Sequence, residues 1–214
     1  MVQEIERKIM FQDTYTKLNP TDVENIVNKT AASFEGVSFN HANTIIMSRT
    51  LDFYPGFRFY DMADHTNNPA TRRFALIKKD NVVVLDFTNA PIYDVNKSAP
   101  IYLNEDTVHD YVRFFFNFVR GRHGRFLIVE SVDDIAWREE PPAAAKKSIS
   151  KLIMPVALID KGLQDGNFYL HAQMMFRDSL FSADIMVQKD GVVQLSNEQL
   201  LIEDMPVMDD TLGQ

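Results

Sequence analysis

Apolar residues recur at helical spacing near the start of the chain. Over residues 20–34, five of them share one face at intervals of three and four. These residues are Val23, Ile26, Val27, Ala31 and Phe34. Asn19 supplies an N-terminal cap and Pro20 suits the first helical position, so the predicted helix begins there.

A second and clearer helix is predicted over residues 105–120, with Asn104 as its cap. At about 100° per residue, its apolar side chains cover an arc of about 200°. They are Val108, Tyr111, Val112, Phe114, Phe115, Phe116, Phe118 and Val119. The polar stripe contains Asp106, His109, Asp110, Arg113, Asn117 and Arg120. So wide an arc predicts burial on more than one side, either inside a curved sheet or with one flank in an oligomer interface.

Alternation of apolar and polar residues predicts strands on both sides of this helix. Residues 37–60 are expected to form strands around a Tyr54-Pro55-Gly56 turn, and residues 74–87 form a predicted hairpin. Two alternating runs between residues 168 and 188 predict an antiparallel meander with one buried face. A further strand and a short helix are predicted at 125–130 and 143–153.

Helices and groups of strands are segregated along the chain, which favours an α+β fold over a doubly wound α/β sheet. We expect a single domain over residues 1–214, in which an antiparallel, curved β-sheet packs around the long apolar helix. Cystatin-like and NTF2-like folds offer an analogy at the level of architecture. Residues 1–15 are expected to form a loosely held arm, and residues 203–214 an acidic C-terminal tail.

Composition is that of a globular protein, with 45% hydrophobic and 24% charged residues. Cysteine is absent, which excludes disulfides, thiolate metal sites and a cysteine nucleophile and fits a reducing compartment. No basic start followed by an apolar run is visible, and no apolar run approaches the about 20 residues that cross a bilayer. We therefore expect a cytoplasmic protein with no membrane association.

The formal net charge of −8 makes nucleic acid an unlikely partner, because attraction to phosphates needs a basic surface. The acidic excess is concentrated near the C-terminus. Residues 190–214 hold six Asp and Glu residues and no Lys or Arg, which leaves −2 for residues 1–189.

The most unusual stretch is Arg120-Gly121-Arg122-His123-Gly124-Arg125, where the predicted helix turns into a strand. Its four potential cations, Arg120, Arg122, His123 and Arg125, are candidates for binding an anion or an acidic partner, because arginine forks suit carboxylate or phosphate. The alternative is a cationic C-cap that complements the helix dipole.

Common catalytic signatures are missing, including phosphate-binding glycine loops, nucleophile elbows and zinc-protease motifs. The five histidines are widely separated, so neither a metal site nor a cofactor is predicted. If a pocket lies between helix and sheet, its polar candidates are His109, Arg113, Asn117 and His171.

The run from Tyr111 to Glu130, together with Ser196-Asn197-Glu198, resembles an uncharacterised family of bacterial proteins. The resemblance extends from about Tyr54 to the C-terminus. It implies a self-contained family and carries no activity that can be transferred to this chain.

We expect a non-enzymatic protein-interaction or adaptor module that binds a protein partner and forms a homo-oligomer. The wide apolar helix face, the separated basic and acidic segments and the missing catalytic motifs favour this function. The alternative is a small-molecule-binding protein or enzyme with a pocket between helix and sheet. Attraction is also expected between the acidic tail, residues 203–214, and the arginine cluster: either the tail docks on the cluster of its own chain, or the cluster serves an outside partner.

Overall fold

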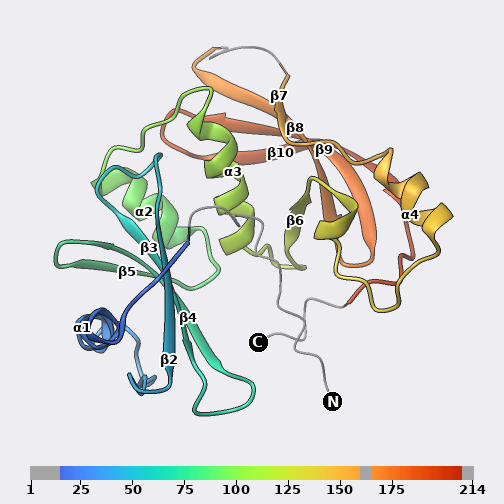
Figure 1. The fold of residues 1–214 in the computed structure, drawn as a ribbon. Coiled ribbons are helices and arrows are strands. Elements are labelled where there is room, and N and C mark those ends of the chain that lie inside the picture. The colour runs from blue at the N-terminus through green and yellow to red at the C-terminus, as the bar shows by residue number, and fades with distance from the viewer. Residues whose placement is uncertain (1–14, 160–164, 209–214) are drawn as a thin grey trace. The chain divides into compact units, whose positions relative to one another are not determined.

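The computed structural model describes residues 15–159 and 165–208. The chain forms two compact units: unit 1 comprises Met1–Asp86 and Ala90–Tyr102, and unit 2 comprises Phe87–Asn89 and Leu103–Gln214. Each unit has its own helices and an antiparallel five-stranded sheet (Figure 1). The predicted α+β class is confirmed, although the strands form two sheets where one was expected. That the whole chain behaves as one domain stays a prediction.

Unit 1 contains a sheet whose strands lie in chain order, each antiparallel to the next. The strands are β1 (Thr16–Lys17), β2 (Thr44–Thr50), β3 (Arg58–Asp64), β4 (Thr71–Lys78) and β5 (Asn81–Leu85), and the helices are α1 (Pro20–Thr30) and α2 (Ala90–Ser98). Helix α1 begins where predicted, because the Asn19 side chain accepts a hydrogen bond from the backbone N–H of Asp22 at 2.9 Å. It ends four residues earlier than residue 34, the predicted end.

One face of the unit 1 sheet packs against α1. Val23 and Val27 of the helix join buried side chains of three strands in one apolar cluster. The strand members are Ile46, Met62, Ala75 and Ile77. The helical spacing that predicted α1 therefore corresponds to its buried face.

Unit 2 contains a sheet in the order β10-β9-β8-β6, and β7 also pairs with β8. Its elements are α3 (Thr107–Phe118), β6 (Phe126–Val129), the 3-10 helix η1 (Val132–Asp134), α4 (Ala143–Ser150), β7 (Ala157–Leu158), β8 (Asn167–Phe176), β9 (Ser179–Gln188) and β10 (Val193–Ile202). β8 and β9 form the two antiparallel strands of the predicted meander, and β10 adds a third strand beside β9.

Helix α3 is the long apolar helix of the prediction. The Asn104 side chain caps it by accepting hydrogen bonds from the N–H groups of Asp106 and Thr107. Its buried side chains are Thr107, Val108, Tyr111, Val112, Phe114, Phe115, Phe116 and Phe118. The Tyr111 hydroxyl donates to the carbonyl of Gly191 at 2.6 Å, which ties the helix to the β9–β10 turn.

The apolar arc of α3 is buried within a single copy of the chain. It therefore leaves no apolar flank for an oligomer interface. A homo-oligomer stays a prediction, but this helix no longer motivates it. None of the helices in the described part of the chain combines the length and hydrophobicity needed to cross a bilayer.

The unit 2 sheet is buried on both faces at one end, whereas the strand pattern predicted one buried face. Consecutive residues Gln173, Met174 and Met175 of β8 are all buried. A second apolar cluster explains the difference. In it, Met175 and Leu180 pack with Ile135 of the loop after η1, with Ile149 of α4, and with Met205 and Val207 near the C-terminus. In Figure 1, α3 and α4 lie on opposite sides of this sheet.

We predict that Phe115→Ala lowers the free energy of unfolding by about 3 to 5 kcal/mol, because a large ring that is only 5% exposed leaves a cavity. Urea unfolding followed by circular dichroism measures the loss. Asp106→Ala at the exposed start of the same helix is the control, with a change within about 0.5 kcal/mol. A loss below about 1 kcal/mol for Phe115→Ala would contradict the burial of this face.

Candidate functional site

The candidate site forms where the apolar face of the unit 2 sheet extends beyond its helix. Helix α3 ends at Phe118, and the chain then turns back to begin β6 at Phe126. Phe126 is paired in register with Phe176, the last residue of β8. Their rings are stacked, with centroids 4.6 Å apart and an interplanar angle of 23°, and both side chains remain half-buried.

The turn between α3 and β6 closes over these rings. The N–H of Gly121 donates to the carbonyl of Gly124 at 2.8 Å, and the reverse hydrogen bond measures 3.2 Å. Gly124 has a φ of +140°, and a Cβ atom there would lie 3.0 Å from Cε2 of Phe176. Glycine is therefore required for the turn to approach the Phe176 ring.

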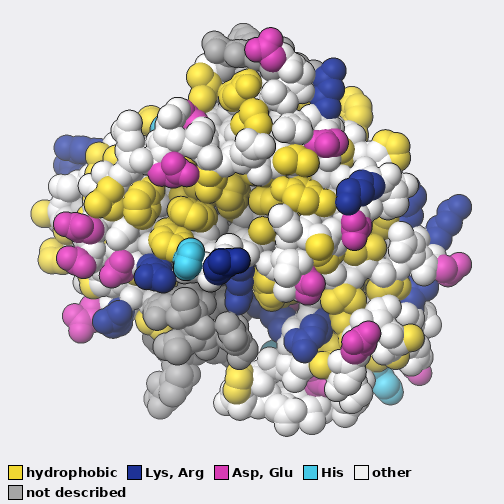
Figure 2. All heavy atoms as spheres, turned by 180° about the vertical axis from the view of Figure 1, so that it is seen from behind, with side chains coloured by type: hydrophobic (Ala, Val, Ile, Leu, Met, Phe, Trp, Pro, Cys, Tyr) yellow, Lys and Arg dark blue, Asp and Glu magenta, His cyan; other side chains and the backbone are white. Residues whose placement is uncertain are grey.

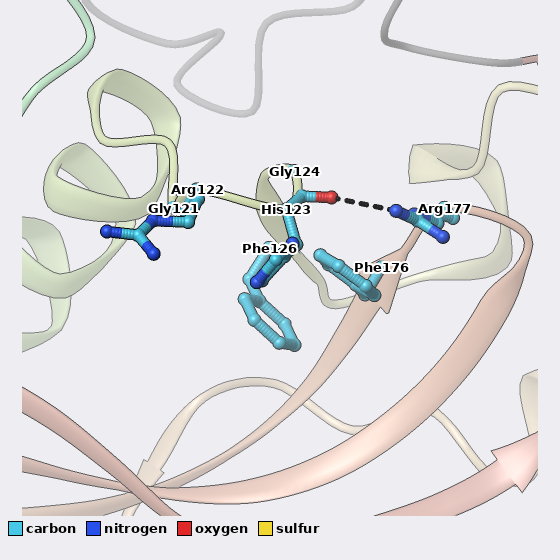
Figure 3. Close-up of a pocket in the computed structure, with 7 residues that line it drawn as sticks. All are labelled: Gly121, Arg122, His123, Gly124, Phe126, Phe176 and Arg177. Atoms are coloured by element: carbon cyan, nitrogen blue, oxygen red, sulfur yellow. Dashed lines mark hydrogen bonds between the residues drawn. The ribbon is translucent and has the colours of Figure 1, made fainter.

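A hollow of about 550 Å³ lies between this turn and the end of the sheet (Figure 3). We call it the Arg–Phe notch. Its lining residues are Gly121, Arg122, His123, Gly124, Phe126, Phe176 and Arg177. In Figure 3 the rings of His123, Phe126 and Phe176 lie together, and the guanidinium groups of Arg122 and Arg177 point outward on either side.

Arg177 joins the β8–β9 turn to the turn above the rings. Its Nη2 donates to the backbone carbonyl of His123 at 3.2 Å, and its guanidinium lies 5.4 Å from the centroid of Phe176. Sequence reasoning missed both Arg177 and Phe176. The missing information was the pairing of β6 with β8, which brings together residues separated by 50 positions.

The predicted cationic cluster divides into two kinds of residue. Arg120 lies 4.1 Å from the ring centroid of Phe87, and Nη1 of Arg125 donates to the carbonyl of Asn117 in the last turn of α3 at 3.4 Å. Arg122 and His123 are exposed, and the Arg122 guanidinium makes no hydrogen bond or ion pair with residues that the structure describes. The C-cap interpretation thus fits Arg125, and the binding interpretation fits Arg122.

The predicted pocket residues on α3 have local roles. Arg113 donates two hydrogen bonds of 2.7 Å to the carboxylate of Glu130 and a third, of 2.9 Å, to Asp110. Burial raises the pKa of Glu130, but hydrogen bonds and charge from Arg113, with the N–H of Val156, outweigh it, so this pKa lies below its usual range. Arg113 is therefore committed to holding α3 against the end of β6.

The other two candidates on α3 do not complete a pocket. Nδ1 of His109 lies 2.9 Å from the backbone carbonyl of Glu105, one turn earlier in the chain. The amide nitrogen of Asn117 is buried and has no hydrogen-bond partner among the described residues. Neither residue lines the notch, nor the second hollow, of about 540 Å³, in unit 1.

His171 lies in β8 and belongs to a separate polar group. Its Nδ1 lies 2.8 Å from Oδ1 of Asp184, and the Asn197 side chain donates to Oδ2 of the same carboxylate at 2.8 Å. Asn197 has a φ of +55° at a register shift in β10. Hydrogen bonds from Asn197 and then His171 hold the pKa of Asp184 below its usual range.

Among the described residues, the acidic C-terminal segment forms no ion pair with the arginine cluster. The backbone N–H of Met205 donates to the carbonyl of Asp178, and Met205 and Val207 are buried in the second apolar cluster. The carboxylates of Glu203 and Asp204 are exposed and form no ion pair with described residues. Residues 209–214 lie outside the described residues, so docking of the tail stays a prediction.

Charge is mixed over the surface drawn in Figure 2, where basic side chains lie among acidic and hydrophobic ones. Over residues 15–159 and 165–208, no group of three or more His, Asp or Glu side chains is arranged to hold a metal ion. Comparison with known proteins found no matching family model, no matching curated protein and no matching solved structure. Membership of the bacterial family therefore stays a prediction.

We predict that Gly124→Ala destabilises the protein by about 1 to 3 kcal/mol, because alanine is strained at this φ and its methyl group would press on Phe176. Thermal unfolding measures the loss. Gly121→Ala in the same turn is the matched control, since its Cβ would lie 3.4 Å from the nearest atom, the carbonyl oxygen of Gly124. Equal losses in the two variants would contradict the close approach to Phe176.

We predict that Asn197→Gly raises the pKa of Asp184, because glycine keeps the positive φ and removes the amide donor. An NMR titration of the Asp184 carboxyl group measures this shift. A depressed carboxyl pKa stabilises the fold above the unfolded pKa of about 3.9, and the effect is lost as pH falls through the folded pKa. The difference in free energy of unfolding between Asn197→Gly and the wild type should therefore become smaller towards low pH. A difference that does not change with pH would show that Asn197 does not lower the pKa of Asp184.

Proposed function

We propose that this chain is a non-enzymatic protein-interaction module that binds an acidic segment of a partner at the Arg–Phe notch. The observation that carries the proposal is an exposed guanidinium, that of Arg122, beside a stacked pair of half-buried rings. Aromatic side chains and arginine are the residues most enriched at protein interfaces. The notch combines both within seven lining residues.

The chemistry of the notch favours binding over catalysis. Its lining side chains include no carboxylate, hydroxyl or amine. A nucleophile paired with a base, or two carboxyl groups, would be the usual minimum for group transfer or hydrolysis. An apolar floor with guanidinium groups at its rim suits recognition of a carboxylate beside an apolar group.

A second candidate function, a small-molecule-binding protein or enzyme, is favoured by the polar group around His171. Asp184 and Asn197 orient the imidazole through Nδ1, which leaves Nε2 available to a ligand. The His171 side chain is 39% exposed, so it lies within reach of solvent. An added mass in native mass spectrometry that disappears in His171→Ala would support this alternative.

The location and assembly of the protein belong to the same proposal. Absence of cysteine supports a cytoplasmic location, where thiols would stay reduced. Homo-oligomerisation is part of the same proposal, and exposed apolar side chains of unit 2 such as Met154 and Leu200 are available to such an interface.

We predict that Arg122→Glu weakens binding of a fluorescein-labelled glutamate-rich peptide by about tenfold, the effect of losing about 1.4 kcal/mol. Fluorescence anisotropy at low salt measures the dissociation constant. The matched control is Lys189→Glu, which makes the same charge change at the exposed β9–β10 turn, at the opposite end of β9 from Arg177. Equal weakening by both variants would show only long-range repulsion and would overturn the proposed site.

A further inference from the structure

We infer that the Arg–Phe notch recognises an aromatic side chain flanked on both sides by carboxylates in a short peptide segment. The inference rests on the proposed function and names the chemistry of its partner. Three features carry it: the half-buried ring pair, the hydrogen-bonded turn above it, and the guanidinium groups on either side.

The ring pair selects for an aromatic guest. Phe126 and Phe176 are already stacked and half-buried, and the ring of His123 lies beside them (Figure 3). A guest ring would extend this group by offset or edge-to-face contact, which is worth about 0.5 to 1.5 kcal/mol beyond the area it buries. An aliphatic side chain would bury apolar area in the notch but would make no ring–ring contact.

The notch is organised before any guest binds. Two hydrogen bonds between Gly121 and Gly124 close the turn, and Gly124 lies against the Phe176 ring. Arg177 then ties this turn to the β8–β9 turn through the carbonyl of His123. The turn therefore needs little reordering when a guest binds, whereas the exposed Arg122 side chain would become ordered only with the guest.

The guanidinium groups select for carboxylates at the flanks. Arg122 makes no hydrogen bond with described residues, and a guanidinium carries five N–H donors. Among the described residues, Arg177 donates one hydrogen bond, to the backbone carbonyl of His123, and keeps donors for a guest. The two groups point outward on opposite sides of the rings, so each can receive one carboxylate of a bound peptide.

The charge distribution favours a peptide over a nucleic acid. Arg120 is engaged with Phe87 and Arg125 with the C-terminal turn of α3, which leaves Arg122, His123 and Arg177 at the notch. A nucleic-acid-binding protein contacts about 6 to 10 phosphates. The notch has far fewer cations, and the net charge of −8 would repel the phosphates that they do not contact. Two carboxylates match the two arginines without extending beyond them.

The test is a set of labelled pentapeptides titrated into the full chain by fluorescence anisotropy. The central residues are Glu-Phe-Glu, Glu-Ala-Glu or Gln-Phe-Gln, each flanked by glycine, and a five-nucleotide oligothymidine is added as a fourth probe. We expect Glu-Phe-Glu to bind most tightly. Loss of the ring or of both charges should weaken binding by about tenfold each, corresponding to about 1.4 kcal/mol.

Two variants separate the two kinds of recognition. Phe176→Leu keeps an apolar side chain and removes the ring, so it should reduce the preference for Glu-Phe-Glu over Glu-Ala-Glu. Arg122→Gln should reduce the preference for Glu-Phe-Glu over Gln-Phe-Gln, and Lys189→Gln is the matched control. Chemical-shift changes at the amides of Gly121 and Gly124 locate each peptide, and thermal unfolding confirms that each variant is folded.

The outcomes distinguish this inference from the function on which it rests. Equal affinity for Glu-Phe-Glu and Glu-Ala-Glu, with shifts at both glycine amides, overturns the aromatic specificity and leaves the acidic-partner site standing. No peptide binding and no shift at these amides overturns both. Tighter binding of oligothymidine than of any peptide overturns the inference in favour of base stacking beside phosphate.

Discussion

Burial of the α3 side chains is the interaction on which unit 2 depends. Eight side chains of this 12-residue helix are buried, and four of them are phenylalanines. A helix so apolar must be enclosed, because each large apolar side chain left in water would cost about 1.5 to 3 kcal/mol. Its capping by Asn104 and the ion pair between Arg113 and Glu130 then fix where the helix begins and how it meets β6.

The position of the notch follows from this helix. The sheet face that α3 covers is longer than the helix, so the Phe126–Phe176 pair lies beyond Phe118 at the uncovered end. The chain leaves the helix at Val119, whose backbone is extended, and Gly121 and Gly124 then close the tight turn over the rings. The same geometry commits Arg125 to a carbonyl of the last helical turn and leaves Arg122 exposed.

Much of the fold could be predicted because periodicity is a local property. Both long predicted helices, the β4–β5 hairpin and the β8–β9 pair appear within a few residues of their expected bounds. Helix α2 was missed because only Ile92 and Val95 of its nine residues are buried, too few to display a period. The strands form two separate sheets, and which strands pair depends on contacts between residues distant in sequence. The periodicity of a single segment carries no information about such contacts.

The candidate site could be predicted only in part, for the same reason. Four cations in six residues stand out in the sequence, so Arg122 and His123 were found. Their partners Phe176 and Arg177 resemble ordinary strand and turn residues until β6 is paired with β8. The predicted pocket residues are not all brought together: strand alternation puts His171 on the same face of β8 as Met175, which packs in the cluster that includes Ile149 of α4.

The alternation of the two units along the chain has a consequence for biosynthesis. Phe87–Asn89 belongs to unit 2 although both flanking segments belong to unit 1, so the units are interleaved and no single cut separates them. On the ribosome, unit 1 cannot be completed until residue 102 has emerged, and Phe87 must then wait for Arg120, the side chain that stacks on it. Proteolytic excision of either unit would therefore leave the other incomplete.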